Sequence, residues 1–491
     1  MSLTRRDFLG FATGRFAPAL AQPAGPKASA DDPILHLLNR ISWGPLPDEL
    51  AHARAIGAAA YLDEQLNPEG IDDSAAEARL RQRTPLWYVD RRDIYRLASG
   101  EWRAYEDLTY GTIFRAVYSK RQLLERMVDF WSDHFNVSSD QAAVERLEMQ
   151  RQVIIPHALG NFKDLLVGTA KSPAMLYYLD NYVNYAEAPN ENYARELMEL
   201  HTLGVDGGYT EEDVREVARA FTGWTVHEGS RTGFYFDPNN HDGESKWVLG
   251  HRLPAGRGIE DGFHVLQILA QHPATAQFLS RKLCVRFVSD NPPQALVDST
   301  AAVWRDTGGE IRPVLRHLFL SPEFAAAQGQ KFRRPLEFLI GALRATGTEL
   351  VDDWVLEQMV AATGQVPFNW HPPNGYPDVA GAWQSTNGLL ARWNIAMQLT
   401  HGAWSDHDDT GWGLLSHLRD QIGNPATVGE LVDETAAGIF GTQLSGANRD
   451  AFIRFTADDG PADTPVDAHL LARKYGSLFG LMLASPLYQW R

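Results

Sequence analysis

The sequence predicts a mainly α-helical protein built as one large multi-helix domain. Apolar residues recur at helical spacing along much of the chain, as they do at Leu124, Val128 and Trp131. Of the 491 residues, 44% are hydrophobic and 11% are aromatic, which is enough to bury a large core. Glycine and proline gather mainly in one stretch, residues 225–258, and no long flexible linker is evident. We therefore expect a single helical domain over residues 33–490.

Helical periodicity places the expected elements in chain order. The predicted helices cover residues 33–39, 50–66, 124–135, 149–159, 192–203, 211–221, 274–288, 292–304, 335–345, 389–399 and 468–483. Within residues 225–258, two apolar segments at 234–236 and 247–249 flank a turn-rich segment, which predicts a small β-hairpin or an ordered loop. The single cysteine, Cys284, falls on an apolar helix face, so we expect it to be buried and no disulfide to form within the chain.

The first 21 residues have the pattern of an export signal. Arg5 and Arg6 precede Phe8 and Leu9, and the apolar stretch that follows ends at Ala21. This pattern is typical of a twin-arginine export signal over residues 1–21, so we expect a periplasmic or secreted protein that is exported folded. The apolar stretch is shorter than the roughly 20 residues that a membrane span needs, and no later segment qualifies. We therefore expect no transmembrane span in the mature chain.

The charge of the chain restricts the partners that it can have. The formal net charge is −17. An acidic surface of this kind repels nucleic acids and anionic lipid headgroups, so we expect no nucleic-acid partner. Cations, neutral polymers and proteins fit better.

The densest polar segment is residues 190–204. On a helical wheel, Glu191, Arg195 and Glu199 share one face, whereas His201 lies on the other. Glu196 and Glu199 lie about 60° apart and could face a shared site. Two interpretations remain open: an ion-pair ladder beside a core histidine, or a polar site that other segments complete.

Two further segments carry candidate site residues. His134 ends the helix expected at 124–135, where it fits a core or capping position as well as a site. His241 and Asp242 lie in the glycine-rich excursion, where an imidazole and a carboxylate can approach other elements. The segment resembles a calcium loop only in part, because its spacing is wrong. We expect His241 or Asp242 to approach the helix end around residues 191–199, or the turn after His134.

Several common catalytic and binding motifs are absent from the sequence. It contains no Gly-x-Ser-x-Gly elbow, no Walker loop, no His-Glu-x-x-His and no Cys-x-x-Cys pair. Common hydrolase, nucleotide and zinc sites therefore lose support.

Taken together, a series of motifs resembles the bacterial domain-of-unknown-function family numbered 1800. The motifs lie at residues 125–137, 178–181, 190–204, 218–224, 241–246, 272–276, 282–288, 334–335, 364–365 and 374–377. The resemblance covers nearly all of residues 33–490. It implies an exported, mostly helical bacterial protein without an established reaction or cofactor. It also implies a candidate partner, an exported protein similar to sulfatases or alkaline phosphatases.

Two classes of function follow. The preferred one is an exported periplasmic or envelope protein that serves as a binding or accessory factor for a partner protein or a surface polymer. The alternative is a periplasmic enzyme with a His/carboxylate site, with a divalent metal ion as a candidate cofactor. Its catalytic candidates are His134, Glu191, Arg195, Glu196 and Glu199, and its substrate-binding candidates are His241, Asp242 and Lys246. The motifs do not fix a reaction.

Overall fold

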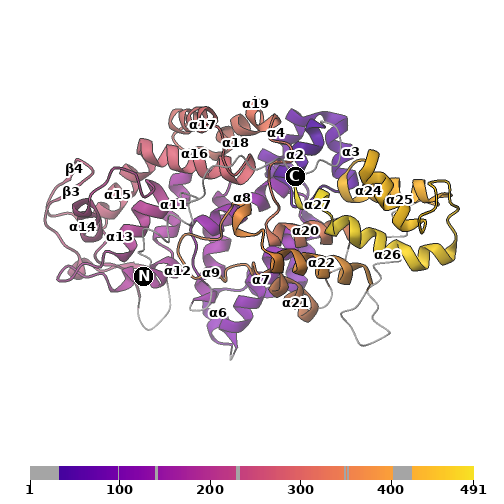
Figure 1. The fold of residues 1–491 in the computed structure, drawn as a ribbon. Coiled ribbons are helices and arrows are strands. Elements are labelled where there is room, and N and C mark those ends of the chain that lie inside the picture. The colour runs from indigo at the N-terminus through magenta and orange to yellow at the C-terminus, as the bar shows by residue number, and fades with distance from the viewer. Residues whose placement is uncertain are drawn as a thin grey trace, which may run out of the picture.

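The described part of the chain is mainly α-helical, as predicted. The computed structural model describes residues 32–97, 99–138, 142–227, 233–347, 350, 353–401 and 423–491, so the expected export signal lies outside these residues. The described residues form helices and two small two-stranded sheets. Figure 1 shows an elongated body with the strands β3 and β4 at one end and the helices α24 to α26 at the other.

The first helices show where helical periodicity is interrupted. The side chain of Asp32 caps the first of them by accepting hydrogen bonds from the backbone N–H groups of Ile34 and Leu35. The helix expected at 50–66 is in fact two helices, because Gly57 has a φ of 89° and no helix continues through that conformation. The elements are α2 (Pro33–Ile41), α3 (Pro47–Ile56), α4 (Ala58–Leu66), η1 (Pro68–Gly70), α5 (Ser74–Arg83), η2 (Pro85–Tyr88), α6 (Arg91–Tyr95), α7 (Gly100–Tyr118) and α8 (Gln122–His134).

Two of the predicted helices contain π-helical turns. Residues Gln150–Ile154 and Leu197–Thr202 are π-helical, and the hydroxyl of Thr202 donates to the carbonyl oxygen of Leu197 at 2.7 Å. Such wide turns are frequent at functional sites. The elements here are α9 (Ala143–Met149), η3 (Gln150–Ile154), α10 (Ile155–His157), α11 (Phe162–Ala170), α12 (Pro173–Tyr178), η4 (Asn181–Val183), α13 (Asn192–Glu196), η5 (Leu197–Thr202) and α14 (Glu211–Ala220).

The excursion expected at 225–258 is two antiparallel hairpins. Strand β1 (Trp224–Val226) pairs with β2 (Phe234–Phe236), and β3 (Lys246–Val248) pairs with β4 (His251–Leu253). The two apolar segments therefore pair with other strands and not with each other, and η6 (Pro238–Asn240) lies between them. Leu249 and Gly250 connect β3 to β4 with φ values of 47° and 80°, the left-handed pair that a two-residue hairpin turn requires.

The remaining helices complete two large hydrophobic clusters. Buried residues of α8, α11 and α14 to α18 form one cluster, and buried residues of α7, α20 to α22 and α24 to α26 form the other. These elements are α15 (Glu260–Gln271), α16 (Pro273–Phe287), α17 (Gln294–Asp306), α18 (Ile311–Phe319), α19 (Pro322–Ala325), α20 (Pro335–Thr346), α21 (Asp353–Thr363), η7 (Ala380–Ala382), α22 (Thr386–His401), α24 (Val428–Phe440), α25 (Gly446–Thr456), α26 (Ala468–Ala484) and α27 (Pro486–Gln489). Cys284 is a buried free thiol in the first cluster. Among the described helices, none is both long and apolar enough to span a bilayer.

Candidate functional site

The outer face of α13 and η5 carries the ion-pair ladder that the helical wheel suggested. Arg195 lies 3.1 Å from a carboxylate oxygen of Glu191 and 3.7 Å from one of Glu199. A third carboxylate, that of Glu211 at the start of α14, accepts from Arg195 at 2.7 Å. The hydrogen bond to Glu211 is the main reason that the pKa of Arg195 is raised. Three acidic groups thus share one guanidinium.

Glu196 is separated from this ladder by the turn of the helix. It is buried, whereas Glu191 is partly exposed. Glu199 contacts the ladder and also Tyr209, whose pKa is raised by burial and by the Glu199 carboxylate. Glu196 and Glu199 therefore do not act on the same surface.

The buried rings of His134 and His201 and the partly exposed Lys282 form a second group at the end of α8. Nε2 of His134 lies 3.1 Å from the carbonyl oxygen of His201, so it donates there and leaves the lone pair on Nδ1. The amine of Lys282 on α16 donates to this Nδ1 at 2.9 Å. Burial and the nearby lysine hold the pKa of His134 well below its ordinary value, and burial lowers that of His201 to about 3. Both rings are neutral at physiological pH.

His241, Asp242 and Lys246 do come together, but around residues that the sequence did not single out. Asp242 accepts from Arg219 of α14 at 2.7 Å, and the buried amine of Lys246 lies 2.9 Å from Asp261 of α15. Burial alone would raise the pKa of Asp261, but the imidazole of His241, whose Nε2 lies 3.6 Å from the carboxylate, and the hydrogen bond from Lys246 outweigh it and lower the pKa. The three predicted residues thus form a paired cluster that ties the hairpins to α14 and α15.

This hairpin cluster and the ladder sit at opposite ends of α14. Glu211 at its start belongs to the ladder, and Arg219 near its end holds Asp242. Eight residues of helix separate them by about 12 Å. Hydrogen bonds of His241 and Asp242 within the described residues go to Arg219, Thr222 and their own loop. The eight candidate residues therefore occupy four places: the ladder, the buried Glu196, the His134 group and the hairpin cluster.

A buried charge network that the sequence did not predict lies between the two hydrophobic clusters. Arg286 of α16 lies 2.9 Å from Asp129 and 3.0 Å from Asp378. Arg334, just before α20, lies 2.7 Å from Asp133. Burial raises the pKa of Asp133 to about 6 against the pull of Arg334. The adjoining cavity measures about 20 Å³, room for about one water molecule, so the network ties the interior together and leaves no space for a larger ligand.

Glu337 continues this network on the side of α20. It accepts from Arg126 of α8 at 2.5 Å and from Arg491 at 2.8 Å, and all three side chains are almost fully buried. These cations hold the pKa of Glu337 well below its ordinary value even though burial alone would raise it. Ion pairs of this kind mainly enforce which helices meet.

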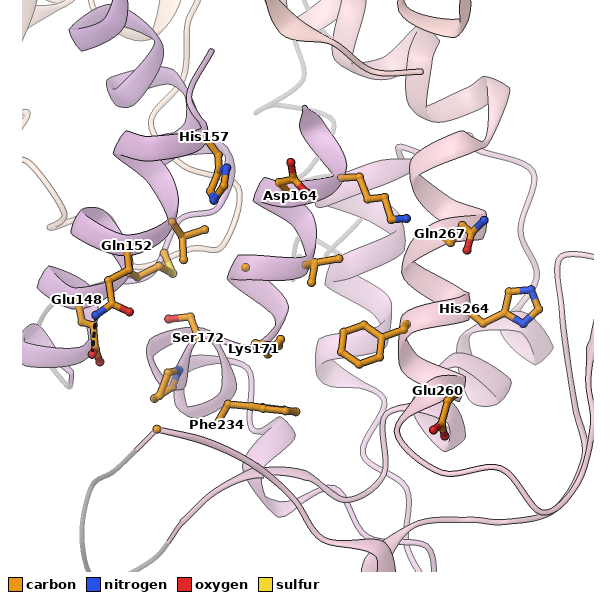
Figure 2. A pocket seen from close by; sticks show the side chains of 18 of the residues that line it. Glu148, Gln152, His157, Asp164, Lys171, Ser172, Phe234, Glu260, His264 and Gln267 are labelled. Atoms are coloured by element: carbon orange, nitrogen blue, oxygen red, sulfur yellow. Dashed lines mark hydrogen bonds between the residues drawn. The ribbon is translucent and has the colours of Figure 1, made fainter. Parts of the chain in front are cut away.

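An open groove of about 910 Å³ lies elsewhere, between η3 and α15 with α11 along its floor. Figure 2 shows side chains that line it from η3, α10, α11, the turn after α11, β2 and α15: Gln152, His157, Asp164, Lys171, Ser172, Phe234, His264 and Gln267. Its volume falls within the range of about 300–1,000 Å³ that is typical of small-ligand sites. Lys163 and Lys171 also border it, and neither amine has a carboxylate within 4 Å among the described residues.

None of these groove residues was predicted from the sequence. Lys163 and Lys171 are eight residues apart, roughly two helical turns, on a helix that no motif marked. The one available signal was a pair of cations on one helix face of an acidic protein.

No metal site is evident in the described part of the chain either. The described residues contain no group of three or more His, Cys, Asp or Glu side chains arranged to hold an ion.

Comparison with known proteins identifies the family to which the chain belongs. The family model described as "Protein of unknown function (DUF1800)" matches residues 36–490. The chain belongs to this family. The resemblance that the motifs indicated is thereby confirmed for nearly the whole chain. No curated protein and no solved structure gives a significant match.

Proposed function

We propose that the protein is an exported binding factor and that the groove between η3 and α15 is its ligand site. Export is proposed by the twin-arginine route, on the pattern of Arg5 and Arg6. The observation that carries the binding role is the pair of lysines, Lys163 and Lys171, whose charges no carboxylate of the described residues neutralises. Ordinary solvation suffices for isolated surface lysines, but two in one groove favour a negatively charged ligand.

The state of the candidate catalytic carboxylates also favours binding over catalysis. A general base has to be free to accept a proton from a substrate. Glu191 and Glu199 instead face the guanidinium of Arg195, and Asp242 is held by Arg219. The pKa of Asp242 is lowered, because the hydrogen bond from Arg219 outweighs its burial. These carboxylates are therefore engaged in ion pairs and not free to act on a substrate.

The proposed ligand is a partner protein or a surface polymer. Family resemblance adds one candidate partner, an exported sulfatase-like or phosphatase-like protein. The groove is open to solvent, so a segment of a longer chain is a candidate ligand as well as a small molecule.

A periplasmic enzyme is the second candidate, and one observation favours it. Lys282 donates to a neutral His134, and burial lowers the pKa of the lysine to about 8. An amine that is partly deprotonated near neutral pH is a candidate nucleophile or base. This role requires a substrate to reach Lys282, which is partly exposed.

One experiment separates the two candidates. Wild-type protein, Lys163→Glu/Lys171→Glu and Lys282→Met are immobilised, and retention of periplasmic polymer and protein is measured by surface plasmon resonance. We expect the groove variant to lose most of the retained mass and Lys282→Met to keep it. Lys120→Glu is the control, because Lys120 is exposed and does not line the groove. Retention that survives the groove substitutions, or that disappears with Lys282→Met at an unchanged melting temperature, contradicts the binding proposal.

A further inference from the structure

The groove combines unpaired cations with paired ones. Arg91 lies 2.5 Å from Glu148, and Arg257 lies 3.0 Å from Asp261, so the charges of both arginines are locally balanced. Lys163 is exposed, and Lys171 is partly buried with its amine 5.5 Å from the ring centroid of Phe234. Anionic groups of a ligand would therefore meet the lysines, which bind as flexible point charges and do not demand one planar geometry.

Acceptors as well as donors line the same groove. The carboxylates of Asp164 and Glu260 line the groove with the amide of Gln267, and no arginine or lysine pairs with either carboxylate among the described residues. Hydroxyl groups both donate and accept, so a hydroxyl-rich ligand can satisfy all of these groups. A polysaccharide carries several hydroxyl donors on each sugar for the two carboxylates, whereas the acidic side chains of a peptide carry none when ionised.

A buried hydroxyl gives a second, independent indication of a polar ligand. Ser172 lines the groove and is 5% exposed, yet its Oγ has no hydrogen-bond partner within the described residues. In Figure 2 this side chain lies between the wall that carries Gln152 and the floor formed by α11. An unsatisfied buried hydroxyl is unfavourable, and a ligand hydroxyl, or a water held by one, would supply the missing hydrogen bond.

Aromatic rings complete the lining. Phe234 and Phe263 border the groove on the side of α15. The negative face of an aromatic ring attracts the positively polarised C–H groups of a sugar ring, whose other edges carry hydroxyls. Flat apolar rings beside donors, acceptors and lysines match a charged carbohydrate better than a lipid or a nucleotide.

Resting on the proposed binding function, we propose that the groove binds a segment of an anionic polysaccharide. Lys163 and Lys171 hold its carboxylate or sulfate groups. Asp164, Glu260 and Ser172 contact its hydroxyls, and the phenylalanine rings contact its sugar faces. Carboxylate and sulfate present the same negative oxygen atoms to a lysine, so the two kinds of polymer share this chemistry.

Binding of defined probes to the full exported protein tests the proposal. Four fluorescently labelled probes are titrated in low-salt buffer: oligogalacturonate, dextran sulfate, neutral dextran and polyglutamate. We expect oligogalacturonate or dextran sulfate to bind, which also distinguishes carboxylate from sulfate, and we expect neutral dextran and polyglutamate not to bind. Affinity falls with added salt because the contacts are exposed.

Variants locate the binding. Lys163→Glu/Lys171→Glu is expected to weaken binding at least about tenfold, and the milder Lys163→Gln/Lys171→Gln about three- to tenfold, a change of about 0.7–1.4 kcal/mol. Lys120→Glu makes the same change of charge at one lysine that lies outside the groove. We expect this variant to bind the anionic probes as the wild type does. A melting temperature within a few degrees shows that each variant is folded.

Several outcomes overturn the proposal. Equal binding of polyglutamate assigns the groove to acidic peptides, which refutes the carbohydrate ligand and leaves the binding function standing. Absence of binding by both anionic polysaccharides, or equal weakening by Lys120→Glu, refutes the ligand class as well. The proposed function itself fails only on the separate retention experiment, so the two failures are distinguishable.

Discussion

The amine of Lys282 lies 2.9 Å from Nδ1 of His134, and no carboxylate within the described residues pairs with that amine at 4 Å or less. A buried lysine is usually neutralised by an acid. Here its hydrogen-bond acceptor is a neutral imidazole, which stabilises the amine without cancelling its charge. Burial therefore dominates and lowers the pKa of Lys282 to about 8.

Because its pKa is low, we expect Lys282 to be acylated at a lower pH than an ordinary lysine. Acetic anhydride reacts with neutral amines, so the extent of labelling follows deprotonation. We expect labelling of Lys282 to rise with a midpoint near pH 8, and not near the ordinary value of 10.5. Mass spectrometry of peptides measures it, with the exposed Lys120 as an internal standard for the reagent. A midpoint close to 10.5 would show that the amine is better solvated than its contacts imply.

His201 predicts a dependence of stability on acid. Burial lowers its pKa from 6.5 to about 3, so between these values the unfolded chain binds a proton that the native protein does not. The free energy of unfolding contributed by this ring is complete above pH 6.5 and is lost as pH falls toward 3, by about 1.4 kcal/mol per pH unit. We expect His201→Gln to flatten the curve of unfolding free energy against pH, measured by urea denaturation from pH 4 to 7. Parallel curves for the two proteins would contradict it.

Glu337 predicts a large loss of stability. Changing it to Gln leaves Arg126 and Arg491 buried without their carboxylate, which costs about 3–5 kcal/mol. Glu211→Gln is the matched control, because the side chain of Glu211 is 68% exposed and solvent screens its pair with Arg195, so we expect a much smaller loss. Denaturant titration of both variants gives the comparison. Similar losses for the two would mean that water reaches the buried network.

The loop that contains Gly375 packs so closely against α8 that we expect no side chain to be tolerated at this position. An added Cβ would lie 2.1 Å from the carbonyl oxygen of Asp133, and φ at this residue is +70°. We expect Gly375→Ala to cost about 2–5 kcal/mol. Gly381→Ala, which meets nothing within 4 Å, should change stability by less than about 1 kcal/mol. The two melting temperatures report the difference, and equal values would show that the loop moves freely away from α8.

The export proposal predicts that export fails even when the positive charges at residues 5 and 6 are kept. Changing Arg5 and Arg6 to lysine should leave the protein in the cytoplasm, because the export receptor reads guanidinium groups. Cell fractionation and immunoblotting measure the distribution. An unchanged periplasmic yield would refute the route.

Local patterns in the sequence predicted the helical class and part of the helices, because amphipathic periodicity lies within each helix. Helices without a counterpart among the predicted ranges include α7, α11, α18, α21, α24 and α25. Helix α8 was expected at 124–135 and extends over Gln122–His134. Interruptions were harder to predict. Gly57 resembles any helical glycine until its φ of 89° is known, and the π-turn at Leu197–Thr202 preserves the apolar pattern around it.

Residues distant in sequence explain what was missed at the candidate sites. The sequence marked His241, Asp242 and Lys246, but their partners Arg219 and Asp261 come from separate helices. No spacing rule relates positions that only the fold brings together. The groove was missed for the opposite reason, since lysines on a helix surface are ordinary until the surrounding walls are known.

The pairing of Arg126 with Glu337 has a consequence for the timing of folding. The two residues are 211 positions apart. At about 5–20 residues per second, about 10–40 s of synthesis separate them. Throughout that interval Arg126 of α8, which is buried in the folded protein, lacks its partner Glu337 because α20 has not yet been synthesised. The buried pair therefore cannot form until α20 has left the ribosome, and until then the guanidinium of Arg126 depends on water for its hydrogen bonds.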